Sequence, residues 1–151
     1  MFVEYSTMVE ANISEVEKRF DEIRSGEVTD VKVIHPDGDE LVARVGPTSG
    51  IARNVKLDIG RGSVQSSGLV YPVHWMPTSA EALFPELTAD LTLAHAGRGH
   101  TRLTIQGTYQ PPLGAIGRLA DRAFLGRLAE ATVANLMDRL AAALSEQPST
   151  S

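Results

Sequence analysis

The histidines are the first residues to consider for metal binding or proton transfer. They lie at positions 35, 74, 95 and 100, and no two of them have the spacing that places two ligands on one helix face. The chain has no cysteine, which excludes a thiolate zinc site, a cysteine nucleophile and a disulfide. His35, His95 and His100 lie in or beside predicted turns, where water is their expected partner. We therefore expect no metal site and no cofactor.

Two Gly-Arg-Gly sequences, at residues 60–62 and 97–99, are the next candidates, because glycine-rich loops can bind phosphate. Neither precedes a predicted helix, and the lysine of a Walker motif is missing. Ser63, Ser66 and Ser67 lie in a predicted turn region without the Gly-x-Ser-x-Gly sequence of a nucleophile elbow. Carboxylates are numerous, but the sequence alone pairs none of them for acid–base catalysis. The motifs therefore assign no catalytic residue.

The sheet that would position functional residues is predicted from alternating apolar and polar side chains. Such alternation occurs at 41–45, 55–59, 69–76, 87–93 and 102–106, and strands are also expected at 2–10 and 28–35. Turn sequences at 36–39, 46–50 and 60–62 separate the strands. One short helix, capped by Asn12 or by Ser14 with Glu17, ends near residue 25. Many strands with short links predict an antiparallel sheet, because parallel crossovers need intervening helices.

A long C-terminal helix is predicted from about residue 113 to residue 144, after the proline pair at 111–112. Apolar residues cover so much of its circumference that protein must cover it on more than one side. A curved sheet does this, whereas a flat sheet would leave part of the helix exposed. The expected fold class is α+β, with a curved antiparallel sheet gripping the terminal helix. The residues of its small-residue face are Ile116, Ala120, Ala123, Ala131, Ala134 and Ala141.

Length, charge and composition limit the partners. The 151 residues suit one domain, which we place at 1–145, and we expect residues 146–151 to form a disordered tail. The formal charge of −5 and the scattered arginines argue against nucleic acid. Charged residues interrupt the apolar C-terminal segment, so we expect no integral membrane segment. The first residues lack a secretory signal pattern, and we expect a cytoplasmic protein.

Residues 103–122, LTIQGTYQPPLGAIGRLADR, resemble the closing strand and helix start of actinobacterial members of the START-like superfamily, which includes the polyketide cyclases. The order of the predicted elements matches that superfamily over nearly the whole chain. The resemblance implies a helix-grip fold with a cavity between sheet and helix that accepts lipids, polyketides or other apolar molecules. It implies no shared catalytic residue, because this superfamily mostly binds ligands and only some branches catalyse reactions.

Three aromatic residues are candidates for the wall of such a cavity. Tyr71 and Trp75 share one face of a predicted strand, and Tyr109 lies at the end of the last strand. The functional interpretation is that their polar tips orient a ligand in an otherwise apolar pocket. The simpler interpretation, which we favour, is that Tyr71 and Trp75 are ordinary core aromatics.

Arg127 is the basic candidate, because it falls on or near the alanine-rich face of the long helix. A cation there is costly unless it is paired, and Glu130 or Asp90 could supply the carboxylate. Alternatively, Arg127 binds an anionic group of a ligand, or extends its stem over apolar surface with its head in water. Together these arguments predict the following ligand-binding residues: Tyr71, Trp75, Tyr109, Ile116, Ala120, Arg127 and Ala131.

Three functions are compatible with these observations. The leading hypothesis is a protein that binds an apolar small molecule, such as a lipid, without catalysis. The second is an enzyme of the cyclase, aromatase or dehydratase type, in which one or two polar groups move protons in the same cavity. The first candidates for these groups are Tyr71, His74, Tyr109 and Arg127. The third is an interaction module whose apolar surface meets another protein or its own copy, as in a homodimer. The sequence does not identify the ligand.

Overall fold

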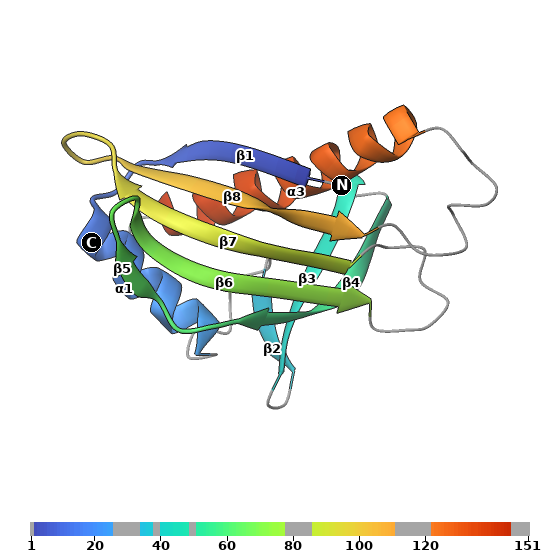
Figure 1. The fold of residues 1–151 in the computed structure, drawn as a ribbon. Coiled ribbons are helices and arrows are strands. Elements are labelled where there is room, and N and C mark those ends of the chain that lie inside the picture. Colours follow the sequence, from blue (N-terminus) through green and yellow to red (C-terminus); the bar gives the residue numbers. More distant parts are fainter. Residues whose placement is uncertain are drawn as a thin grey trace.

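The fold is known from a computed structural model, which describes residues 2–25, 34–37, 40–48, 51–77, 86–110 and 122–145. Within these residues the strands form one antiparallel sheet in the order β1-β8-β7-β6-β4-β3-β2, with β5 paired to β6. Figure 1 shows the curled sheet with α3 beside it, and this arrangement confirms the predicted α+β fold class. The strands and helices are β1 (Phe2–Val9), α1 (Ile13–Arg24), β2 (Ile34–Asp37), β3 (Glu40–Thr48), β4 (Ile51–Ile59), β5 (Ser63–Gln65), β6 (Gly68–Pro77), β7 (Glu86–His95), β8 (Thr101–Gln110) and α3 (Arg122–Ser145).

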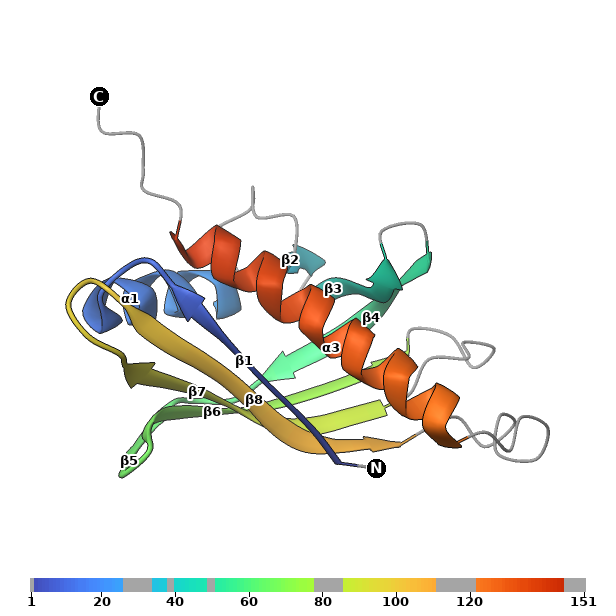
Figure 2. The ribbon, with the colours of Figure 1, turned by 90° about the horizontal axis from the view of Figure 1, so that it is seen from above.

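Helix α3 is held between the two arms of the curled sheet. It packs mainly against β3 and β1, which lie far apart in the strand order, and it has fewer contacts with β8 (Figure 2). Two consecutive residues of α3 make these attachments. Asp138 accepts a hydrogen bond of 2.7 Å from the hydroxyl of Tyr5 on β1, and Arg139 donates to the backbone carbonyl of Arg44 on β3. The helix therefore bridges the arms of the sheet.

The concave face of the sheet carries the core. In β7, residues 87, 89, 91 and 93 are buried while their neighbours face outward, and β8 shows the same alternation at 101, 103, 105 and 109. The strand β6 confirms the predicted face, because Tyr71, Val73 and Trp75 are all buried. Burial of one large apolar side chain contributes roughly 1.5–3 kcal/mol, so these strands supply much of the stabilising free energy. The buried residues of α3 that meet this core include Val133, Leu136, Met137, Leu140 and Leu144.

Helix α1 covers one end of the concave face. Asn12 caps it, accepting a hydrogen bond of 3.1 Å from the backbone N–H of Glu15. Ser14 lies inside the helix and donates to the Asn12 side chain, so the alternative cap by Ser14 is wrong. The helix buries Val16, Phe20 and Ile23 on one side. Among the described helices, none is long and apolar enough to span a membrane.

Three of the predicted turn regions are placed differently in the structure. Residues 46–48 continue β3, and the register with β4 shifts between Val45 and Thr48. The glycine and proline there therefore lie within the strand, at this irregularity, and do not form a turn. Residues 63–65 form the short strand β5 rather than part of a turn. Residues 36–37 belong to β2. The predicted helix is observed from Arg122 onward, while residues 113–121 and the tail at 146–151 lie outside the described residues.

Candidate functional site

Trp75, Leu87 and Tyr109 form a row across the concave face of the sheet. Trp75 on β6 pairs in register with Leu87 on β7, which pairs with Tyr109 on β8. Because side chains directly opposite each other on an antiparallel sheet lie on the same face, the three are neighbours. Trp75 and Leu87 are fully buried, and Tyr109 is 3% exposed. The row lies where β6 and β8 end and β7 begins, on the same side of the molecule as the start of α3 (Figure 1).

Tyr109 brings a polar group into this apolar row. Burial raises the pKa of its phenol well above the ordinary value of 10.0. Among the described residues its hydroxyl has no hydrogen-bond partner. The phenol is therefore uncharged at neutral pH.

Tyr71 lies on the same face of β6, but its polar and aromatic contacts are with helix α1. Its hydroxyl donates a hydrogen bond of 3.2 Å to Asp21, and its ring meets the ring of Phe20 edge-on at a centroid distance of 4.6 Å. Burial and the neighbouring Asp21 carboxylate together raise the pKa of Tyr71 well above its ordinary value. These contacts connect α1 to the sheet, so the polar tip of Tyr71 already has a partner.

A groove of about 380 Å³ runs between the edge strand β1 and α3. Its apolar lining comes from Val3 of β1 and from Ala131, Val133 and Ala134 of α3, and its polar residues are Glu4, Tyr5, Arg127 and Glu130. Val3 and Val133 are core residues, so the floor of the groove is continuous with the interior between sheet and helix. The structure thus brings together Arg127 and Ala131, two of the residues predicted from the sequence.

Arg127 is exposed, so it avoids the desolvation cost expected for a cation on a buried helix face. In the part of the chain that the structure describes, no carboxylate lies within the 4.0 Å of an ion pair with it, although Glu130 lines the same groove. Asp90 cannot be its partner, because Asp90 faces outward from β7 on the opposite side of the sheet. Ala131 is half-buried at the groove. Ile116 and Ala120 lie outside the described residues.

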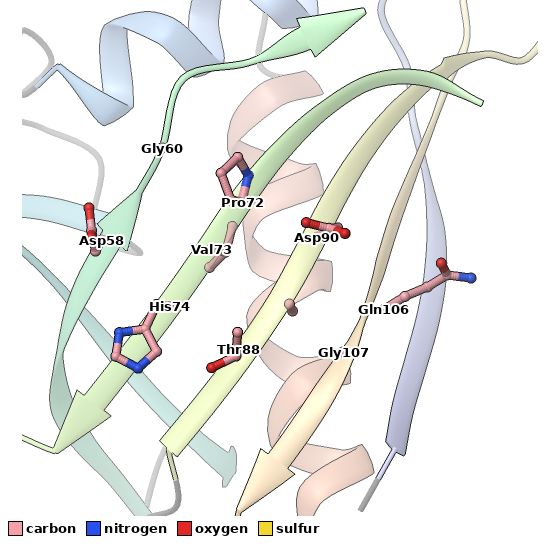
Figure 3. A pocket seen from close by; sticks show the side chains of 10 residues that line it. Asp58, Gly60, Pro72, Val73, His74, Thr88, Asp90, Gln106 and Gly107 are labelled. Carbon is pink, nitrogen blue, oxygen red and sulfur yellow. The ribbon is translucent and has the colours of Figure 1, made fainter. Parts of the chain in front are cut away.

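A second hollow, of about 320 Å³, lies on the convex side of the sheet, where His74 faces away from the buried Trp75. Figure 3 shows Asp58, His74, Thr88, Asp90 and Gln106 around it, on the side of the sheet facing away from α3. His74 Nε2 lies 2.7 Å from Glu86 Oε1, so this imidazole already has a hydrogen-bond partner at the surface. The same alternation that predicted the concave face places these polar residues together on the other face. Among the described residues, no three potential metal ligands cluster here or elsewhere.

Comparison with known proteins places this geometry in a fold. No protein-family model matches the chain, and no curated protein sequence matches it significantly. Among solved structures, TTHA0849 of Thermus thermophilus has a TM-score of 0.58 at 16% identity, covering 95% of this chain and 97% of that chain. Norcoclaurine synthase from Thalictrum flavum, solved with dopamine and hydroxybenzaldehyde, has a TM-score of 0.54 at 10% identity, covering 99% and 89%. Zhui aromatase/cyclase from a Streptomyces species has a TM-score of 0.51 at 16% identity, covering 95% and 93%.

These identities show the fold and nothing about the reaction or the ligand. The neighbours are helix-grip proteins, so the resemblance inferred from residues 103–122 is confirmed at the level of architecture. The chain therefore has the helix-grip fold, in which a curled antiparallel sheet holds the C-terminal helix.

Proposed function

We propose that the protein binds a largely apolar small molecule, such as a lipid, between the concave face of the sheet and α3. The observation that carries this proposal is the groove between β1 and α3. Its volume of about 380 Å³ lies within the range of roughly 300–1,000 Å³ typical of ligand pockets. Its apolar floor suits an apolar ligand, and its polar lining residues can orient one end of that ligand.

The way α3 is held also supports this function. The helix is attached to β1 through Asp138 and to β3 through Arg139, and it contacts the central strands β6 and β7 much less. Helix α3 therefore lies mainly against the arms of the curled sheet rather than against its central strands.

In this proposal the sequence-predicted residues have different roles. Trp75 and Tyr109 form the inner wall, Ala131 contributes to the apolar lining of the groove, and Arg127 can hold an anionic or polar end of the ligand at the surface. Tyr71 contributes its ring but not its hydroxyl, which is bonded to Asp21. Ile116 and Ala120 stay predictions from the sequence.

The first experiment uses Trp75, which is the only tryptophan of the chain. Titration with fatty acids and with polyketide-like aromatics should change its emission with saturation, and a chelator should leave the response intact. Calorimetry should give the same affinity. An absence of saturable binding across a broad apolar library would refute the proposal and favour the interaction module, whose oligomeric state light scattering would then reveal.

The second experiment fills the groove. Ala131→Leu should weaken binding about tenfold, while stability changes by no more than about 0.5 kcal/mol because the groove has room for the added atoms. Ala142→Leu is the matched control, since Ala142 is exposed on the same helix and should leave the affinity unchanged. If Ala131→Leu instead lowers stability by roughly 1–3 kcal/mol without affecting binding, the position is packed core and the groove is not the site.

An enzyme of the cyclase, aromatase or dehydratase type is the second candidate, favoured by the polar hydroxyl that Tyr109 brings to the concave face. Proton transfer is most efficient when the catalytic pKa lies near the working pH. Burial moves the pKa of Tyr109 in the opposite direction, away from neutrality. Hydrogen-bond donation to a bound ligand is therefore the better role for this residue, and binding without catalysis is the better function.

A further inference from the structure

We propose that the groove between β1 and α3 selects small single-chain ligands whose head carries both an ammonium and a carboxylate, as an aliphatic α-amino acid does. This inference rests on the proposed function, because it names the head of the apolar ligand that the groove would hold. It follows from the polar residues that line the groove and from the volume of the groove.

Two of the polar residues in this lining already have partners within the fold. The hydroxyl of Tyr5 donates a hydrogen bond of 2.7 Å to Asp138 of α3. The carboxylate of Glu4 accepts a hydrogen bond from the side-chain amide of Gln106 on β8. These bonds connect β1 to α3 and to β8, so the fold itself uses both groups.

The other two polar residues of the lining, Arg127 and Glu130, have opposite charges and remain unpaired. Both side chains are exposed, and no ion pair joins them to each other or to another residue in the described part of the chain. They lie three residues apart on α3, so their side chains leave the helix on the same face. An acidic residue that follows a basic one in a helix is also the less favourable order for pairing. The groove therefore offers one unpaired cation and one unpaired anion.

A head with a single charge fits these two residues poorly. A carboxylate alone is attracted by Arg127 but repelled by Glu130, and an ammonium alone meets the opposite combination. A head with both charges can place its carboxylate on the guanidinium, in the bidentate geometry that arginine favours, and its ammonium on Glu130. In an α-amino acid the two groups are attached to the same carbon, and the two long side chains can converge on them. The groove thus distinguishes such a head from that of a fatty acid.

The volume of the groove limits the size of the ligand. A volume of about 380 Å³ has room for about a dozen non-hydrogen atoms at about 30 Å³ each. 2-Aminooctanoic acid has this size, and its hexyl chain suits the apolar lining formed by Val3, Ala131 and Ala134. A lipid with two long chains exceeds this volume, so the ligand has a single short chain.

The test compares four probes with the same chain length: 2-aminooctanoic acid, octanoate, octylamine and octanol. They carry both charges, one negative charge, one positive charge and no charge, and calorimetry at neutral pH and low salt gives their affinities. One exposed ion pair usually changes an affinity by about 2- to 5-fold, so 2-aminooctanoic acid should bind by about this factor more tightly than octanoate and octylamine. High salt should reduce the preference, because it screens exposed charges.

Two single substitutions should change the preference in opposite directions. Arg127→Gln should weaken octanoate relative to octylamine, and Glu130→Gln should weaken octylamine relative to octanoate, while both reduce the advantage of 2-aminooctanoic acid. The matched controls are Arg98→Gln in the loop between β7 and β8 and Glu17→Gln on α1, since both side chains are exposed and neither lines the groove. Each control changes the net charge by the same amount as its counterpart and should leave the preference as it is. All four variants should keep the wild-type melting temperature.

The outcomes separate this inference from the proposed function. A wild type that binds octanoate or octylamine as tightly as 2-aminooctanoic acid overturns the inference, and so does a preference that neither groove substitution changes. In both cases binding of octanol leaves the proposed function intact. Controls that shift the preference as much as the groove variants would show that net charge sets it, which also overturns the inference. If members of the apolar library bind but none of the four probes does, the assignment of the head is wrong, and if the library fails too, the proposed function itself is wrong.

Discussion

The two buried tyrosines of the concave face should make the protein lose stability at high pH. Tyr71 and Tyr109 are 2% and 3% exposed, and burial raises the pKa of both phenols above the ordinary value of 10.0. In the unfolded chain each phenol loses its proton near pH 10, whereas in the folded chain it keeps the proton to higher pH. Above pH 10 the folded state therefore holds more protons, and the free energy of unfolding falls as the pH rises.

The size of the loss follows from linkage. Each phenol that stays protonated in the folded state costs about 1.4 kcal/mol per pH unit above 10. Between pH 9 and pH 11 the two tyrosines together should lower the free energy of unfolding by about 2.7 kcal/mol. Below pH 9 their contribution should be constant, because both states are then protonated.

Urea unfolding followed by circular dichroism at pH 9, 10 and 11 measures this loss. Other groups also titrate in this range, so the informative quantity is the difference between variants. Each of Tyr71→Phe and Tyr109→Phe should remove about half of the loss between pH 9 and pH 11, and the double variant nearly all of the 2.7 kcal/mol, again about 1.4 kcal/mol per phenol. If the double variant loses as much stability as the wild type, the two phenols are not kept protonated by burial, and the arguments from their neutral state fail.

Three other predictions concern the fold. Asn12→Ala should remove the cap of α1 and cost about 1 kcal/mol in urea unfolding, while an unchanged value would show that the bond to Glu15 contributes nothing. Gly107→Ala should cost roughly 1–3 kcal/mol, because the added Cβ collides with the Thr88 carbonyl oxygen and with Ala89 on β7. Deletion from Leu113 onward should abolish cooperative thermal unfolding, since α3 covers the core, and a truncated chain that keeps a sharp transition would contradict this fold.

The sequence predicts this fold well where local rules determine the structure. Alternation at 69–76, 87–93 and 102–106 identifies the concave face, because a strand with one wet face has a period of two. It fails at 46–48, where glycine and proline suggest a turn but β3 continues through an irregular register with β4. Such an irregularity depends on the partner strand, and the residue types of one strand do not encode it.

The candidate site is predicted less completely, because its polar groups find partners far away in the sequence. Alternation places Tyr71 and Trp75 on the same face, but it cannot show that Asp21, fifty residues earlier, accepts the Tyr71 hydroxyl. Arg127 was expected near a buried face, yet the side chain is exposed at the groove. Successive residues of a helix differ by about 100° in direction, so a small error in the assumed rotation decides between core and surface.

This dependence on remote partners also explains why the difference between Tyr109 and the other two tyrosines emerges only from the structure. The three tyrosines are equivalent by residue type, and the alternation of apolar and polar residues places all of them on the concave face of the sheet. The difference between them is that Asp21 reaches one hydroxyl from α1 and Asp138 reaches another from α3, while none of the described side chains reaches the third. The positions of the two helices, which are set by packing, thus determine which tyrosine hydroxyls connect a helix to the sheet.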